Sequence, residues 1–369
     1  MMNRKLSISG FQLFCMIFLF EGGTTSVFGL AHNSKQDGWI SIFISLILCC
    51  ILLYVYLKLY EIYPSLLFTK YIQLILGEYA GKVVALIYIV YFLYIAARDL
   101  RDFEEVLVIT LYNSSSIILI GIIMMSLIVY SLYKGLETFA RANEVIFMLI
   151  VIMLFFLIGA ETISKLQNFN NLRPVLENGI QPILKDVFPI TLTFPFGELI
   201  TFTMIFPYVN KTKKTFKIGF LAIIVTGILM IIFNINNIAI LGASLFERTS
   251  FPLLTAVSFV NIAHFIQRLD TFVIMLMVFG GFIKITIFFY CALSGSADLF
   301  NVKKTEKLIY PLSIIIIMLS LFMAPNYLEH IKEGFEIVPY YLHIPLQVII
   351  PVCLLLIVLI QRKIKFSKK

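Results

Sequence analysis

The sequence contains few charged residues and a single tryptophan. Charged residues make up 14% of the 369-residue chain, whereas soluble globular domains carry about 25%. Hydrophobic residues account for 60% of the chain, and its mean hydropathy is +0.97. Because so few polar side chains cannot cover a surface that faces water, the composition excludes a soluble globular protein and predicts an integral membrane protein.

Motifs for catalysis and metal binding are also lacking. The five cysteines lie within apolar runs without metal-ligand spacing, and the four histidines form no HExxH arrangement. No nucleophile elbow, P-loop or zinc signature occurs. The net charge of +8 is not organised as a basic stripe with interleaved aromatics. We therefore expect no enzyme activity, no cofactor, no metal and no nucleic-acid partner.

Long hydrophobic runs are what the sequence does contain. A helix that crosses the bilayer needs about 20 apolar residues, and ten segments meet this requirement. They cover residues 9–31, 39–60, 82–112, 117–133, 145–161, 187–208, 216–241, 271–293, 308–323 and 340–360. The first has no cleavage site for a signal peptidase and reaches spanning length, so we expect it to be retained. The sequence predicts an all-α polytopic protein with one membrane domain, residues 1–369, and about ten transmembrane helices.

The distribution of lysine and arginine predicts the orientation in the membrane. Roughly nineteen of these residues lie in the two termini and the loops on their side, against roughly seven on the opposite side. Short basic loops remain in the cytoplasm. Both termini and the loop of Lys211, Lys213, Lys214 and Lys217 are therefore expected to be cytoplasmic, and residues 166–177 external.

Two predicted spans are interrupted at matching positions in the two halves of the chain. Span one contains Glu-Gly-Gly-Thr-Thr-Ser at residues 21–26, and span six contains Thr-Phe-Pro-Phe-Gly-Glu at residues 193–198. Glycine and proline leave backbone groups unpaired, and in hydrocarbon such groups line a cavity or bind something. With five spans in each half, the second repeat (about 187–360) is inverted relative to the first (about 9–162), as in the LeuT-type fold with discontinuous helices one and six. The alternative is a pair of simple kinks or small-residue packing faces.

The two breaks supply the candidate ligand-binding residues. Half-helix N-termini suit a carboxylate and C-terminal carbonyls suit an ammonium, so an amino acid zwitterion matches both. The glycines allow close approach, the threonines offer hydroxyls and the phenylalanines form apolar walls. The candidates are Gly22, Gly23, Thr24, Thr25, Thr193, Phe194, Phe196, Gly197 and Glu198.

Charged residues inside the predicted spans are candidates for charge coupling, because such residues are normally paired, hydrated or functional. Glu21 and Glu198 each flank a break; the alternative is a protonated carboxyl group bonded to the freed backbone. Lys284 is the counter-ion candidate for one of them, with snorkelling or a hydrated vestibule as alternatives. In span three, Arg98 with Asp102 has the i,i+4 spacing of a helical ion pair, as does Arg101 with Glu105. This cluster is expected to line a vestibule or, alternatively, to form a lattice that fixes helix packing.

The whole chain resembles the B subunit of the nutrient germinant receptors of bacterial endospores, a branch of the amino acid–polyamine–organocation transporter superfamily. The resemblance rests on Thr-Phe-Pro-Phe-Gly-Glu-Leu at residues 193–199, Phe-Pro-Tyr at 206–208 and Gly38-Trp39. It implies a protein of the spore inner membrane that binds a small nutrient, together with A and C partner subunits, to trigger germination. An active amino acid permease and an ion or water conduit are the alternatives. The first break departs from the Gly-x-Gly motif usual in the superfamily.

Overall fold

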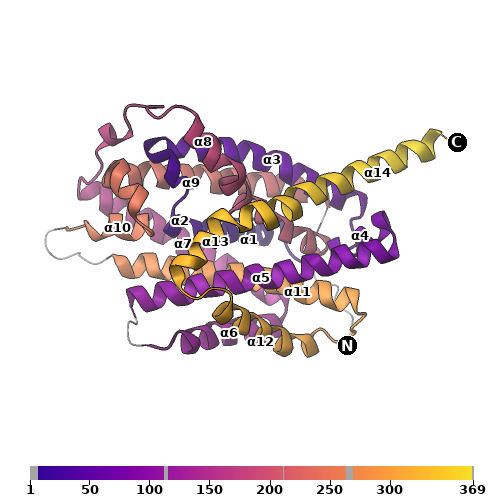
Figure 1. Cartoon of the computed structure of the whole chain (residues 1–369). Coiled ribbons are helices and arrows are strands. Elements are labelled where there is room, and N and C mark those ends of the chain that lie inside the picture. Colours follow the sequence, from indigo (N-terminus) through magenta and orange to yellow (C-terminus); the bar gives the residue numbers. More distant parts are fainter. Residues whose placement is uncertain (1–6, 112–114, 211, 263–268, 368–369) are drawn as a thin grey trace.

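The computed structural model describes residues 7–111, 115–210, 212–262 and 269–367, which are almost entirely helical (Figure 1). No strand occurs in these ranges, where an isolated bridge joins Ile8 and Val209. Tyr112, the predicted end of span three, and Lys211, in a predicted cytoplasmic loop, lie outside the described residues.

The α-helices are α1 (Gly10–Gly22), α2 (Thr25–Phe28), α3 (Gly38–Ile62), α4 (Phe68–Leu76), α5 (Glu78–Thr110), α6 (Ile117–Lys134), α7 (Leu136–Ile163), α8 (Gln181–Lys185), α9 (Thr212–Arg248), α10 (Pro252–Ser258), α11 (Asp270–Leu299), α12 (Glu306–Phe322), α13 (Tyr327–Glu336) and α14 (Ile350–Ser367). Short 3₁₀-helices occur at η1 (His32–Asp37), η2 (Phe169–Leu172), η4 (Phe196–Met204) and η5 (Phe206–Tyr208). Wider π-helical turns form η3 (Asp186–Thr191) and η6 (Pro339–Ile349).

The number of membrane spans agrees with the prediction of about ten. Nine helical segments of the described chain are long and apolar enough to cross a bilayer, and α12 with α13 forms a tenth if this bent pair is counted as one span. The two helices meet at 102°. Because α12 has only 17 residues, it is about 26 Å long and shorter than the hydrocarbon core. The chain is an all-α polytopic membrane protein, while the inverted repeat stays a prediction.

Helices α5 and α11 run side by side through the middle of the bundle (Figure 1). In α11, 72% of the most apolar stretch is buried inside the protein, against 33% in α6 and in α7. The outer helices instead expose apolar side chains such as Ile123 and Phe155, as contact with lipid tails requires. The intramembrane charges of spans three and eight therefore lie on two helices that pack against each other.

The break in span one is slight. Gly23 and Thr24 separate α1 from α2 but keep right-handed helical backbone angles. The hydroxyl of Thr25 donates to the carbonyl of Glu21 at 2.6 Å, and the hydroxyl of Ser26 donates to the carbonyl of Gly22 at 2.6 Å. Side chains of the same segment thus bond the backbone carbonyls at this break.

The break in span six is much larger. The chain passes from α8 through the π-turn η3 to the 3₁₀-helix η4, with Pro189 inside the turn and Pro195 at the start of η4. Proline lacks an N–H group and interrupts the regular helical ladder. The hydroxyl of Thr193 donates to the carbonyl of Pro189 at 2.9 Å. This irregular segment brings Phe194 and Glu198 toward the centre of the bundle.

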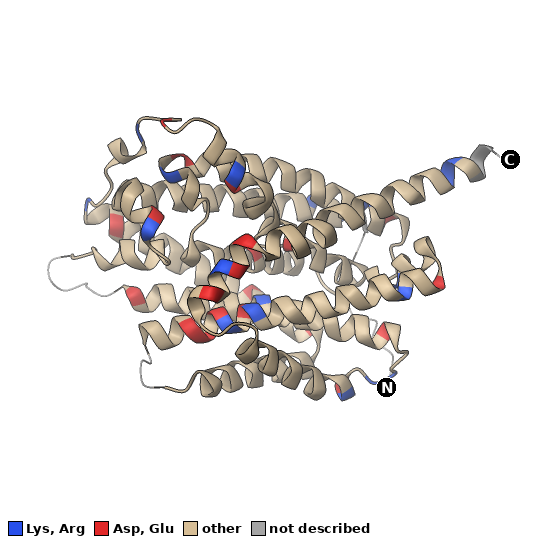
Figure 2. Cartoon of the chain, viewed as in Figure 1, with Lys and Arg blue, Asp and Glu red and all other residues tan. Residues whose placement is uncertain are grey.

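Both ends of the described chain lie at the same end of the bundle, and α8 and α10 lie at the other (Figure 1). At the first end, the N–H of Ile8 donates to the carbonyl of Tyr208 at 2.8 Å. An even number of crossings returns a chain to the side on which it began, so this arrangement agrees with ten spans. Figure 2 shows charged residues concentrated in the middle of the bundle, where α5 and α13 lie close together.

Candidate ligand-binding site

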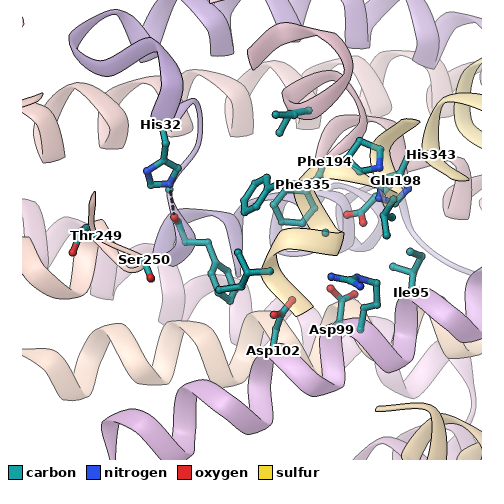
Figure 3. Close-up of a pocket in the computed structure, with 18 of the residues that line it drawn as sticks. His32, Ile95, Asp99, Asp102, Phe194, Glu198, Thr249, Ser250, Phe335 and His343 are labelled. Atoms are coloured by element: carbon teal, nitrogen blue, oxygen red, sulfur yellow. Dashed lines mark hydrogen bonds between the residues drawn. The ribbon is translucent and has the colours of Figure 1, made fainter. Parts of the chain in front are cut away.

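A cavity of about 260 Å³ lies between α5, α13 and the broken sixth span. Figure 3 shows that it extends from Glu198 and His343, in the middle of the bundle, to Thr249 and Ser250 beside α10. The lining also includes aromatic and charged or polar side chains, namely those of Phe28, His32, Arg98, Asp99, Asp102, Phe194 and Phe335. Apolar walls with a few convergent polar groups are typical of a small-molecule site.

A buried ion pair stands beside this cavity. Lys284 of α11 is completely buried, and its Nζ lies 2.7 Å from Oε2 of Glu198 and 3.7 Å from Oδ1 of Asp99. The same ammonium lies 4.1 Å from the ring centroid of Phe194, within the range of a cation–π interaction. Glu198 therefore has its counter-ion inside the protein, and Lys284 is that counter-ion.

The charges of span three reach across to α13. A guanidinium N–H of Arg98 donates to the carbonyl of His330 at 2.6 Å, and Nη1 of Arg98 lies 3.8 Å from the carboxylate of Glu333. Asp102 Oδ1 lies 3.1 Å from His330 Nε2. The predicted pair between Arg98 and Asp102 is therefore wrong, because both side chains take partners on α13. A Cβ at Gly334 would lie 2.7 Å from Arg98 Nη2, so glycine permits this close approach.

The second predicted pair of span three is confirmed. Arg101 Nη2 lies 2.6 Å from Oε1 of Glu105, one helical turn further along α5. Neither residue lines the cavity. The charged residues of span three therefore fall into two groups. Arg98 and Asp102 line the cavity, whereas Arg101 and Glu105 pair with each other along α5.

A polar network that the sequence analysis did not identify supports the inner end of the cavity. The amide of Gln347 donates to the hydroxyl of Tyr91 at 2.8 Å, and its nitrogen lies 3.0 Å from Nδ1 of His343. The hydroxyl of Tyr91 lies 2.8 Å from the same ring nitrogen. Both neighbours can donate a hydrogen bond, so Nδ1 accepts and the ring proton is on Nε2. The sequence signal that could have predicted this network is a histidine and a glutamine four residues apart in an apolar span.

The predicted residues of the first break do not line the cavity. A Cβ placed on Gly23 would lie 2.5 Å from Cα of Gly280, which shows that α1 and α11 cross in backbone contact there. A Cβ placed on Gly22 would lie 3.3 Å from the side-chain methyl group of Thr226 in α9. Thr24 and Thr25 are buried away from the cavity. The structure thus gives these glycines a packing role, and ligand contact by the first break stays a prediction.

The residues of the second break divide between the cavity and the helix packing. Phe194 and Glu198 line the cavity, whereas Thr193 and Phe196 do not. Gly197 packs against Gln347, whose side-chain oxygen occupies the space that a Cβ would need. The hydroxyl of Tyr56 donates to the carbonyl of Gln347 at 2.6 Å and lies 3.3 Å from the carbonyl of Gly197, so it joins the two segments.

Glu21 lies near the buried ion pair but outside the cavity lining. Its side chain is fully buried, and neither carboxyl oxygen has a hydrogen-bond partner among the described residues. Arg98 and Asp102, the remaining charge-coupling candidates, line the cavity directly. Asp99, Phe335 and His343 also line it and were absent from the predicted set of binding residues.

Comparison with known proteins identifies relatives over the whole length of the chain. Residues 7–328 match the protein family described as "Spore germination protein". Over 369 residues the chain is 35% identical to spore germination protein KB of Bacillus subtilis (strain 168), and the alignment covers 99% of this chain and 98% of that protein. It is 29% identical over 293 residues to spore germination protein YndE of the same organism, with 78% of each chain covered. Spore germination protein A2 of that organism is 25% identical over 319 residues, with 84% of this chain and 86% of that protein covered.

Proposed function

Because the chain belongs to the family of spore germination proteins, we propose that it is the nutrient-sensing membrane subunit of a spore germinant receptor. It binds a small nutrient in the central cavity, and binding triggers germination. Its partners are the A and C subunits of the receptor complex, its site of action is the spore inner membrane, and both termini face the cytoplasm. The two halves are inverted repeats of five spans each.

One observation carries this proposal: the cavity reaches the broken sixth span and adjoins a buried ion pair. Phe194 and Glu198 come from the irregular segment itself, and Lys284 pairs with Glu198 from the opposite helix. Irregular backbone at membrane depth is tolerated where it lines a cavity, and broken spans of this kind surround substrate sites.

Direct binding measurements on the purified receptor test the proposal. Titration with single amino acids and other small nutrients should give saturable binding to the parent protein. A Phe194→Ala variant should bind the same nutrient at least about tenfold more weakly, because an aromatic wall of the cavity is lost. Saturable binding that is unchanged in Phe194→Ala would assign the nutrient to a different site.

Transport is the second candidate function, favoured by the position of the buried ion pair. Glu198, which pairs with Lys284, lies at the end of the cavity away from Thr249 and Ser250, where a carrier needs a barrier that can open. Exchange of labelled nutrient across liposomes that contain the purified protein distinguishes the two functions. Binding without exchange supports a receptor, whereas exchange that saturates with nutrient concentration supports a permease.

A further inference from the structure

A histidine lies at the end of the cavity that is lined by Phe28, Thr249 and Ser250, which we call the mouth (Figure 3). This residue, His32, is the first residue of η1 and also lines the cavity. We propose that His32 is a positioning residue that joins the two sides of the mouth only while its ring is protonated. The inference concerns access to the cavity and does not depend on which molecule the cavity binds.

Both ring nitrogens of His32 face hydrogen-bond acceptors. Nε2 lies 3.1 Å from the carbonyl oxygen of Phe28, a contact that Figure 3 marks with a dashed line. Nδ1 lies 3.2 Å from the carbonyl oxygen of Phe246. A neutral imidazole has one donor and one acceptor nitrogen, whereas the imidazolium has two donors. Only the protonated ring therefore donates to both carbonyls.

The histidine at the other end of the same cavity has the opposite arrangement. Nδ1 of His343 lies 2.8 Å from the hydroxyl of Tyr91 and 3.0 Å from the amide nitrogen of Gln347. Because both neighbours can donate, this nitrogen accepts and the ring of His343 is neutral. The two histidines of the lining therefore provide an internal comparison of protonated and neutral rings.

The two carbonyls that His32 contacts belong to the ends of different helices. Phe28 is the last residue of α2, and Phe246 lies in the last turn of α9, which ends at Arg248. Carbonyls in a last helical turn lack an N–H partner within the helix, and their partial negative charge favours a nearby cation. The imidazolium thus joins α2 to the end of α9 across the mouth.

The surroundings of the ring also favour a positive charge. His32 stacks on the ring of Phe246, with the centroids 5.0 Å apart and the planes at 19°, and aromatic faces attract cations. Asp186 of η3 is 1% exposed and accepts hydrogen bonds from Asn33 and Ser34, the two residues after His32. Its carboxylate attracts a positive charge on the ring.

Other charged groups lie on the elements packed around His32. They are Lys35 and Asp37 of η1, Lys185 of α8, Asp186 of η3, and Glu247 and Arg248 of α9. The sequences of α2, η2 and α10 contain no charged residue, and Lys58 and Glu61 of α3 lie in its last two turns, far along the helix from η1. Lys35 lies 3.2 Å from Glu247 and forms a second link between η1 and α9.

Deprotonation of His32 removes one of the two hydrogen bonds across the mouth. Histidine is the side chain whose charge normally changes near neutral pH. Because the joined arrangement needs the proton, it is complete at low pH and is lost as the pH rises and the ring becomes neutral. Gly242 interrupts α9 with a φ of 72°, so residues 243–248 are joined to the rest of the helix by a non-helical residue. The mouth is therefore held together at low pH and looser at higher pH.

Nitrogen-15 NMR of the purified protein, labelled on histidine, tests the protonation state directly. We expect both ring nitrogens of His32 to carry a proton at about pH 6, whereas Nδ1 of His343 carries none. His32→Gln and His32→Asn assign the signal by removing it, and thermal unfolding verifies that each variant is folded. A His32 ring with one unprotonated nitrogen throughout the range from about pH 5 to pH 8 would overturn the inference.

Hydrogen exchange of the backbone amides in residues 25–29 and 243–250 tests the effect on the mouth. After correction for the intrinsic pH dependence of exchange, the parent should lose about fivefold in protection between about pH 5 and pH 8, the effect of one hydrogen bond. His32→Gln should show low protection at both pH values. Lys35→Gln is the control, because it removes the other link to α9 and keeps the imidazole; it should retain the pH dependence.

Two exchange results would contradict the inference. One is protection in the parent that does not change with pH. The other is a pH dependence that survives in folded His32→Gln, which would assign the titration to Asp186 or Glu247 instead. None of these measurements needs a nutrient, so their outcome and that of the binding experiments on the proposed function are independent.

Discussion

Lys284 is the residue whose removal is expected to destabilise the centre of the bundle most. Its buried ammonium lies between Glu198 and Asp99, and removal of one member of a buried ion pair leaves an uncompensated charge. We expect Lys284→Met to reduce the free energy of unfolding by about 3–5 kcal/mol. The double variant Glu198→Gln with Lys284→Met should lose clearly less than the sum of the two single losses, as measured by unfolding in detergent. Strictly additive losses would mean that the two residues act separately.

Glu198→Gln should weaken the nutrient response by about tenfold, equivalent to roughly 1.4 kcal/mol of binding. Without its closest carboxylate, the buried ammonium of Lys284 keeps only the more distant carboxylate of Asp99, so the charge balance beside the cavity changes. The measurement is the nutrient concentration that gives half-maximal germination. Glu161→Gln serves as the control, because Glu161 is buried, accepts a 2.7 Å hydrogen bond from Asn236 and does not line the cavity. A dose response for Glu198→Gln that coincides with that of the parent would limit this carboxyl group to a structural role.

At the scale of helices, a substitution at the crossing of α1 and α11 tests whether Gly23 packs against α11 or contacts the ligand. In Gly23→Val the added Cβ meets the backbone of Gly280, and overpacking of this kind costs about 1–3 kcal/mol. The variant should therefore unfold at lower temperature and accumulate less in the membrane. Gly159→Val in α7 is the control, since a Cβ at Gly159 meets no atom within 4 Å. If Gly23→Val is as stable as the control but loses nutrient binding, the first break contacts the ligand after all.

The helices were predictable from the sequence because long apolar runs have few alternatives in a bilayer. Residues 117–133 and 145–161 both fall inside helices of the structure, α6 and α7. The end of span nine was predicted to within one residue, since α12 ends at Phe322, but helix α13 after it was not predicted. Residues 324–326, between α12 and α13, contain a proline, but neither the 102° bend nor the contacts of Arg98 and Asp102 with α13 can be read from that residue.

The candidate site was predictable only in part. Glycine marked both breaks and proline marked the second, yet spacing along one helix does not tell which neighbour fills the space beside a glycine. Gly23 meets another glycine, Gly280, from a segment more than 250 residues away. Conversely, the sequence did not distinguish Asp99 from the other charges of span three, and its place in the cavity lining is evident only from the structure.

At the scale of the whole molecule, the account requires one orientation in the membrane. In a Cys353→Ser background, which removes the one exposed native cysteine among those described, single cysteines can replace Lys214, Gln361 or Asn170. We expect a membrane-impermeant thiol reagent to label Asn170→Cys from outside, and Lys214→Cys and Gln361→Cys only after permeabilisation, since basic loops remain in the cytoplasm. Labelling of Lys214→Cys from outside would contradict both the orientation and the inverted repeat.

The central claim is that the nutrient occupies the cavity between α5, α13 and the broken sixth span, and the most direct test is to fill that cavity. Ile95 lines it and is 3% exposed, whereas Val90 of the same helix is 57% exposed and lies outside the lining. The decisive measurement is the dissociation constant of the nutrient for Ile95→Trp and Val90→Trp, with thermal unfolding recorded for both. The account predicts that folded Ile95→Trp binds at least about tenfold more weakly than the parent while Val90→Trp binds normally. Equal affinity in Ile95→Trp and the parent would contradict it.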